Sequence, residues 1–176
     1  MSDPLVAVID ASVAVAIVRG EPEGRAAESV IARLTAAGTR IVVPPHFWLE
    51  VTNALMTRRR WTGEQVLEAI HALDEFGFET RDLDRGLIIL ALDVGERHGL
   101  TSYDAAYLAL AISTDGQIAT FDVALRTAAG VRALPIGSPR SAESRAPYER
   151  TVTWPNYKGA SAFLAKLRAE ATARTG

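Results

Sequence analysis

The sequence predicts a single α/β domain in which a parallel sheet is covered by helices on both faces. Short apolar segments rich in valine and isoleucine alternate with longer segments of helical periodicity. The first of them, Leu5–Ile9, is apolar throughout, as expected of a strand that is buried on both faces. A chain of 176 residues with 48% hydrophobic residues can bury one such core.

The first half of the chain is expected to hold two strand–helix units. The elements are a strand at Leu5–Ile9, a helix after Asp10, a helix over Arg25–Ala37, a strand at Thr39–Val43 and a helix after Pro44-Pro45. Gly38 ends the second helix because glycine readily adopts the left-handed conformation at a helix C-terminus. The two prolines end the strand and suit the first turn of the next helix, where Trp48, Val51 and Leu55 share one stripe.

The second half repeats the alternation. The expected elements are a helix from Thr62 to about Phe76, a strand at Phe78–Arg81, a helix from Asp84 to Gly99, a helix within Leu100–Ile112, a strand at Gln117–Phe121, a short helix that ends near Gly130, and a last strand at Val131–Leu134. Thr62 and Gln65 have the spacing of a capping box. Asp84 is a typical N-cap, and Gly99 is a typical helix stop.

A change of composition divides the chain near residue 137. Residues 1–136 are expected to form the α/β domain, whereas Gly137 to Pro155 are rich in Gly, Pro, Ser, Arg and Glu, as in an irregular linker. Beyond the linker, apolar residues share one helical face: Ala160, Phe163, Leu164, Leu167 and Ala171. Residues 137–176 are therefore expected to form a linker and an amphipathic C-terminal helix that packs against the body or against a second copy of the chain.

Composition excludes several kinds of chemistry. The chain has no cysteine, which excludes disulfides, thiol nucleophiles and thiolate zinc sites. Its only lysines are Lys158 and Lys166, so residues 1–150 hold no Walker, Schiff-base or general-base lysine. Residues 1–150 have a net charge of -5, from 15 Arg and 20 acids, which argues against a strongly basic nucleic-acid-binding module. The N-terminus resembles neither a signal peptide nor a membrane span, so we expect a cytoplasmic protein.

Four acids occupy positions where a parallel sheet gathers functional groups. Asp10 and Asp122 each follow an apolar segment at the point where a strand passes into a helix. In open parallel sheets, the functional crevice lies outside the carboxyl ends of the strands. Glu50 lies within the helix after the proline pair, and Asp104 lies at the start of a later helix. Each alone has an ordinary interpretation: a helix N-cap for Asp10 and Asp122, a capping box with Thr101 for Asp104, and the solvated edge of an apolar stripe for Glu50.

Taken together, the four acids predict one pocket that requires a cation. Crowded carboxylates repel one another unless a positive charge neutralises them. Mg²⁺ takes oxygen ligands and is held by a few carboxylates. Such an ion lowers the pKa of a bound water and stabilises charge on a phosphoryl oxygen, so a phosphodiester can be hydrolysed without a protein nucleophile; one or two ions are both possible.

The motifs around these acids resemble a known family. They are Val-Ile-Asp10-Ala-Ser12, Glu50-Val-Thr-Asn-Ala-Leu, Ser-Tyr-Asp104-Ala-Ala-Tyr-Leu-Ala-Leu-Ala and Ala-Thr-Phe-Asp122-Val-Ala-Leu. In this order and spacing they resemble PIN-domain nucleases, in particular the VapC toxins of toxin–antitoxin systems, over about residues 4 to 136. The tail after about residue 137 departs from the compact form of that family.

The resemblance implies a fold, an activity and partners. The fold would be a three-layer PIN-like α/β fold, with a C-terminal helical extension in this chain. The activity would be Mg²⁺- or Mn²⁺-dependent endonucleolytic cleavage of RNA, by a homodimer that a cognate antitoxin inhibits. By position, the catalytic and metal-binding residues would be Asp10, Glu50, Asp104 and Asp122.

Other residues are weaker candidates, each with an ordinary structural alternative. Ser12 and Thr120 are expected to support the metal site with their hydroxyls, and Asn53 to orient Glu50 or a substrate phosphate. Arg58, Arg59 and Arg60 precede Trp61 and either bind RNA or pair with the C-terminus of their helix. The three histidines, His46, His71 and His98, lack metal-binding spacing and are expected to be structural or exposed.

The main rival class is a non-hydrolytic α/β domain, such as a receiver or a scaffold. A receiver domain would need paired early acids and a lysine, and a dehalogenase-type phosphatase would need an acid where Ser12 stands. A catalytically inactive PIN-like scaffold, or an α/β domain that binds a partner through its acidic pocket, stays open. The RNA also stays open, because chemistry on the phosphate backbone leaves few marks of base preference in a sequence.

Overall fold

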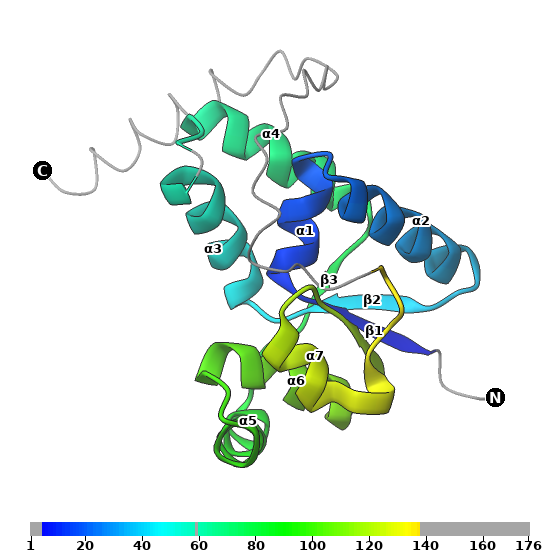
Figure 1. Ribbon diagram of the computed structural model, residues 1–176, viewed down its shortest axis with the longest axis vertical. Coiled ribbons are helices and arrows are strands. Elements are labelled where there is room, and N and C mark those ends of the chain that lie inside the picture. Colours follow the sequence, from blue (N-terminus) through cyan, green and yellow to red (C-terminus); the bar gives the residue numbers. More distant parts are fainter. Residues whose placement is uncertain (1–4, 59, 138–176) are drawn as a thin grey trace, which may run out of the picture.

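The protein is built around a four-stranded sheet in which all strands are parallel. The computed structural model describes residues 5–58 and 60–137 (Figure 1). The strands are β1 (Val6–Ile9), β2 (Arg40–Val43), β3 (Glu79–Thr80) and β4 (Gln117–Ala119), in the order β3-β2-β1-β4. The central β1 pairs with both neighbours, Val8 lying opposite Val42 on β2 and Ile118 on β4.

Helices cover both faces of the sheet, as the sequence predicts. They are α1 (Ala11–Val18), α2 (Pro22–Ala36), α3 (His46–Asn53), α4 (Gly63–Asp74), α5 (Arg85–His98), α6 (Ser102–Ser113) and α7 (Val123–Ala129), with a π-helical turn η1 (Ala54–Arg58) and a 3₁₀ turn η2 (Gly130–Arg132). Figure 1 shows α1 to α4 on one side of the sheet, α6 and α7 on the other, and α5 outside α6. The three-layer α/β architecture is thus confirmed.

The strand order places a topological switch beside β1. The chain moves from β1 to β2 and then outward to β3, and it returns through α5 and α6 to place β4 on the opposite side of β1. The loops after β1 and β4 therefore diverge to opposite faces, leaving a crevice between their carboxyl ends. Asp10 directly follows β1, and Asp122 follows β4 by three residues.

Close packing fixes the elements that carry the site. Val8 and Ile9 on β1 are fully buried, and the hydrophobic residues of α1 are nearly so. Gly24 brings α2 against α1, because a Cβ atom there would lie 2.2 Å from the backbone oxygen of Ala16. The helix that begins at Asp10 is therefore held between the sheet and α2.

The helix boundaries confirm most of the expected capping signals. Thr62 and Gln65 form the predicted capping box at α4. Asp84 caps α5, whose C-cap Gly99 has a φ of 65°. α2 begins at Pro22, before the expected Arg25, because proline suits the first turn of a helix.

The predicted last strand at Val131–Leu134 was wrong. Residues 130–132 form η2, and only Ala133 makes an isolated parallel bridge, with Ile118. Val131 is 99% exposed, so its apolar side chain does not face the core. The adjacent N–H of Leu134 donates to the carbonyl of Ile118 at 2.7 Å, so the predicted strand is reduced to one bridge beside β4.

Two further expectations concern membrane-spanning helices and the C-terminal tail. No helix in residues 5–58 and 60–137 is long and apolar enough to cross a membrane. The predicted linker and amphipathic helix of residues 137–176 lie outside the described residues, except for residue 137. The division at residue 136 therefore stays a prediction.

Candidate acidic site

Asp10 is a buried carboxylate at the carboxyl end of β1. It is the N-cap of α1, and its side chain is almost inaccessible, with 6% of the residue exposed. Its Oδ2 atom accepts hydrogen bonds from the backbone N–H of Ser12 (3.3 Å), from the hydroxyl of Ser12, and from the hydroxyl of Thr120 (2.9 Å). Among the described residues, all hydrogen bonds to this carboxylate end on Oδ2, which leaves Oδ1 available.

The two hydroxyls that hold Asp10 also connect β1 to the end of β4. The Ser12 hydroxyl accepts the N–H of Phe121 (3.0 Å), and the Thr120 hydroxyl accepts the N–H of Asp122 (2.9 Å). Because each hydroxyl accepts an N–H, its own proton is directed at Asp10. The structure therefore brings Ser12 and Thr120 to the candidate site, as expected, in direct contact with the carboxylate.

Burial sets the protonation of Asp10. The loss of solvent raises the pKa of its carboxyl from 3.8 to about 6, although the hydrogen bonds from Ser12 and Thr120 lower it. The negative charge of Glu50 raises it further. The carboxylate of Glu50 therefore lies close enough to act on Asp10.

Glu50 approaches the same place from α3. Its side chain is half-buried, and its Oε2 atom accepts a hydrogen bond from the hydroxyl of Tyr107 at 2.5 Å. Burial raises the pKa of Glu50, the Tyr107 hydrogen bond lowers it, and the charge of Asp104 raises it. Contact between α3 and α6 therefore positions the glutamate, although the two helices are far apart in sequence.

Asp104 lies in the first turn of α6, after the N-cap Thr101. The Thr101 hydroxyl accepts the N–H of Asp104 (3.2 Å) and donates to its Oδ2 atom (2.6 Å). In the capping box that the sequence spacing suggests, the Asp104 carboxylate would accept the backbone N–H of Thr101. Here it accepts the Thr101 hydroxyl instead. Asp104 is partly exposed, and its charge acts on both Glu50 and His46.

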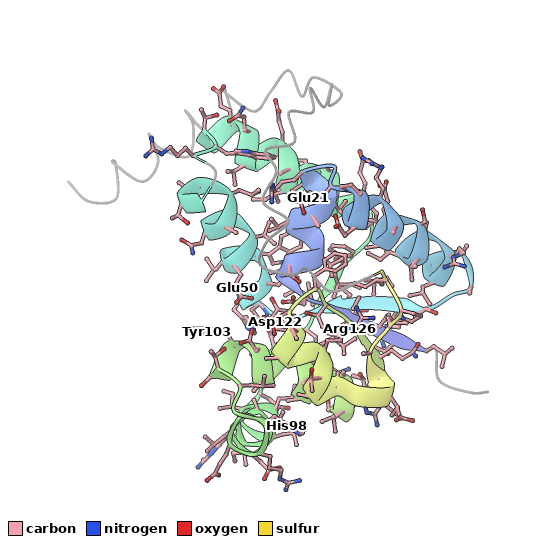
Figure 2. All side chains as sticks on the ribbon, in the orientation of Figure 1. Glu21, Glu50, His98, Tyr103, Asp122 and Arg126 are labelled. Carbon is pink, nitrogen blue, oxygen red and sulfur yellow. The ribbon has the colours of Figure 1, made fainter. Side chains whose placement is uncertain are left out.

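Asp122 is the most exposed of the four acids. It is the N-cap of α7, and its Oδ1 atom accepts the N–H of Leu125 at 2.7 Å. Its backbone is linked to Asp10 through the Thr120 hydroxyl. Figure 2 shows Glu50 and Asp122 at the same end of the sheet, near the start of α6. All four predicted acids thus lie toward the carboxyl edge of the sheet, where Asp10, Glu50 and Asp104 are close enough to interact and Asp122 is linked through its backbone.

Sequence reasoning missed two residues of this site. The fully buried Tyr107 holds Glu50, and the Nε2 atom of His46 lies 4.0 Å from Glu50 Oε2. Burial lowers the pKa of His46, although the charge of Asp104 and a hydrogen bond with the Tyr103 backbone raise it. Within the described part of the chain, that Nε2 atom is buried without a hydrogen-bond partner. The available signal was spacing, because His46 precedes Glu50 by four residues and Tyr107 follows Asp104 by three.

The remaining candidates lie farther from these contacts. Asn53 is exposed in the last turn of α3, and its carbonyl accepts the hydroxyl of Thr57. Arg60 is exposed with a φ of 55°. Arg59 and the side chain of Arg58 lie outside the described residues. The roles suggested for Asn53 and the three arginines stay predictions.

The donor chemistry of the site fits a hard divalent cation. Its side chains offer carboxylate oxygens, and the charges of Glu50 and Asp104 raise the pKa of a neighbouring carboxyl. No described Arg or Lys forms an ion pair with any of the four acids. As these side chains are placed, however, no group of three or more described His, Asp or Glu residues is arranged to hold a metal ion. Binding would require the carboxylates to converge further.

Comparisons with known proteins agree with this architecture. Residues 7–131 match the model of the PIN domain family. A search of curated proteins found no match. One similar solved structure is a toxin–antitoxin complex from Klebsiella pneumoniae, with 16% identity, a TM-score of 0.57, and coverage of 75% of this chain and 98% of that one. Another is PAE2754 from Pyrobaculum aerophilum, with 23% identity, a TM-score of 0.53, and coverage of 73% and 83%. At these identities, the likeness shows a shared fold.

Proposed function

The chain belongs to the PIN domain family, and from that premise we propose that it is a metal-dependent endoribonuclease, the cytoplasmic toxin of a VapC-type toxin–antitoxin pair. The observation that carries the proposal is the placement of carboxylates from three separate elements at one edge of the sheet: Asp10 after β1, Glu50 on α3 and Asp104 on α6. Burial raises the pKa of Asp10 and of Glu50, and the charge of a neighbouring carboxylate raises each further. Such an arrangement is unfavourable by itself and becomes favourable when a cation binds.

The four acids, Asp10, Glu50, Asp104 and Asp122, would hold Mg²⁺ or Mn²⁺. The bound cation supplies positive charge that lowers the pKa of an attacking water and offsets charge on the phosphate. One ion or two would serve this purpose.

The chain's own residues prepare the site for this chemistry. Ser12 and Thr120 hold one oxygen of Asp10 and leave the other available. Tyr107 orients Glu50, and Thr101 orients Asp104. With a pKa of about 6, Asp10 is mostly ionised at neutral pH, which suits a metal ligand. Oriented carboxylates reduce the reorganisation needed when metal and RNA bind.

The same excess of negative charge suits a protein inhibitor. We expect a cognate antitoxin to place an Arg or Lys among the carboxylates, because a cation there replaces the charge of the metal. One solved structure of similar fold is described as a toxin–antitoxin complex. Metal and antitoxin should then compete. A complex whose metal affinity equals that of the free protein would contradict this mechanism.

Self-association is a further part of the proposal. Large apolar side chains on α5 are exposed, and a homodimer would have such surface available for burial: Ile88, Ile89 and Leu92. Sedimentation of the full chain would distinguish a dimer from a monomer.

An inactive scaffold is the second candidate. It is favoured by the absence, among the described residues, of three metal-binding side chains already in place. The retained acids and their oriented hydrogen bonds favour the nuclease. Metal binding by the purified protein distinguishes the two.

Sequencing of RNA 5′ ends after brief induction tests the proposed function in cells. The wild type should produce new ends at discrete sites, whereas Asp10→Asn or Asp104→Asn should produce none. Asp115→Asn is a matched control, because Asp115 lies at the opposite end of β4 with its side chain 94% exposed. Its φ of 48° is also tolerated by asparagine. If Asp10→Asn gave the same ends as the wild type, the assignment of Asp10 would be wrong.

A further inference from the structure

An exposed aromatic ring lies beside the acidic site, in the first turn of α6. Tyr103 directly precedes Asp104, so their Cα atoms are about 3.8 Å apart. The residue is 63% exposed, although tyrosine usually hides much of its ring. Figure 2 shows Tyr103 at the same end of the molecule as Glu50. The ring is therefore accessible to any molecule that reaches the carboxylates.

Contacts with other rings hold Tyr103 in place. Its ring centroid lies 5.7 Å from that of His46, which in turn lies 4.9 Å from the ring of the buried Tyr107. His46 also forms a hydrogen bond with the Tyr103 backbone. A series of rings thus runs from the protein interior to the surface. A ring fixed in this way loses little conformational entropy when a ligand covers it.

Exposed apolar side chains adjoin three of the acids in sequence: Leu49 beside Glu50, Tyr103 beside Asp104 and Val123 beside Asp122. Residues 1–150 carry a net charge of -5. Because such a surface repels phosphates that do not contact the metal, an attraction that does not depend on charge would add to the affinity for RNA close to the acids.

We infer that Tyr103 is a base-binding subsite, on which a nucleobase next to the scissile phosphate stacks. Single-stranded RNA is commonly held by bases that stack on aromatic side chains, and every base offers such a face. Among the three exposed neighbours of the acids, Tyr103 alone has an aromatic face. The inference rests on the proposed nuclease function and adds the part of the RNA that this edge recognises.

Steady-state cleavage of a synthetic RNA oligonucleotide tests the subsite, with Mn²⁺ present and a sequence that spans a cleavage site mapped for the wild type. Tyr103→Ala should raise KM by about tenfold or more and leave kcat within about threefold. Tyr103→Phe should restore most of the affinity because it keeps the ring. Tyr103→Leu should not, because leucine provides apolar area without an aromatic face. Val131→Ala, at a residue that is 99% exposed, controls for loss of an exposed side chain.

Abasic substitution identifies the stacked nucleotide. Each nucleotide near the cleavage site is replaced in turn by an abasic ribose. One abasic position should raise KM for the wild type by about tenfold and cause no further increase for Tyr103→Ala, because the two changes remove the same interaction.

The outcomes separate this inference from the proposed function. A wild type that cleaves no RNA would overturn both. A wild type that cleaves RNA would overturn the subsite alone if Tyr103→Ala kept its KM, if Tyr103→Leu matched Tyr103→Phe, or if abasic and Tyr103→Ala effects multiplied. Tyr103 variants that altered only inhibition by the antitoxin would show a protein contact, which also overturns the subsite.

Discussion

At the scale of single residues, Asp10 combines burial with a charge that the proposed chemistry requires. A carboxylate loses hydration in such a position, and the hydroxyls of Ser12 and Thr120 replace only part of it. The folded protein therefore holds a proton on Asp10 more tightly than the unfolded chain does. This difference links the stability of the metal-free protein to pH.

Asp10→Asn should stabilise the metal-free protein at neutral pH. The folded pKa of about 6 exceeds the ordinary value of 3.8, so the favourable contribution of protonated Asp10 is full below about pH 4 and is lost as the pH rises through about 6. A difference of two pKa units corresponds to about 3 kcal/mol in the free energy of unfolding. Asparagine can still cap α1, so the substitution keeps the helix start. Denaturant unfolding in EDTA between pH 4 and 7.5 measures the difference. A variant that became relatively less stable as the pH rose would contradict the assignment.

Tyr107→Phe should shift the pH dependence of cleavage. The Tyr107 hydroxyl lowers the pKa of Glu50, so its removal raises that pKa and moves the acidic limb of the kcat/KM profile to higher pH. Loss of a hydrogen bond to a charged group also costs about 1.5 to 3 kcal/mol of stability. Ser29→Ala, which removes an exposed hydroxyl on α2, serves as the control. An unshifted limb in Tyr107→Phe would show that Glu50 does not depend on this bond.

Residue-level features were predictable where they depend on local sequence. Asp10 and Asp122 could be placed because each follows an apolar strand. Tyr107 and His46 could not, because their roles arise from contact between α3 and α6, which the linear pattern does not contain. An apolar stripe predicts that a tyrosine is buried, but it does not show to which carboxylate the tyrosine hydroxyl donates a hydrogen bond.

At the scale of elements, the approach of α2 to α1 supports the helix that begins at Asp10. Gly24→Ala should destabilise the protein by about 1 to 3 kcal/mol, because a Cβ atom there meets the Ala16 backbone oxygen at 2.2 Å. This clash outweighs the gain of about 1 kcal/mol in helix propensity. Thermal and denaturant unfolding measure the effect. Ala26→Gly, at an exposed position of α2, should cost only about 1 kcal/mol. A Gly24→Ala variant at least as stable as the wild type would show that the helices can separate without cost.

Element boundaries followed the sequence where caps are local. The capping box at Thr62 and the glycine stop at Gly99 are both encoded within a few residues. The strand expected at Val131–Leu134 failed because a strand needs a partner along its length, and only Ala133 finds one. Alternation of apolar residues cannot show where pairing ends.

At the scale of the whole molecule, the strand order explains why distant acids meet. Asp10 and Asp122 are separated by more than a hundred residues, yet β1 and β4 are neighbours at the switch point. The sequence predicted the layers and the carboxyl-edge location, because both follow from the alternation of strands and helices. The sequence did not predict the strand order β3-β2-β1-β4, because no local pattern shows which strands pair.

A metal ion bound at the carboxyl edge of the sheet should stabilise the whole fold. A cation at a concentration about 100 times its Kd adds about 2.7 kcal/mol to the free energy of unfolding. Mn²⁺ should therefore raise the Tm of the wild type and of Asp115→Asn, and should have little effect on Asp10→Asn. Equal shifts in all three proteins would place the bound metal elsewhere.

The most direct test of the account is cleavage of an end-labelled RNA by the purified full-length chain, measured against Mn²⁺ or Mg²⁺ concentration. The account predicts cleavage at discrete sites that rises to saturation with the metal and is abolished by EDTA. It also predicts a loss of at least about a hundredfold in Asp10→Asn and in Asp104→Asn, with Asp115→Asn active. Cleavage that persists in EDTA, or in either acid variant at the wild-type rate, would contradict the central claim that these carboxylates form a metal-dependent nuclease site.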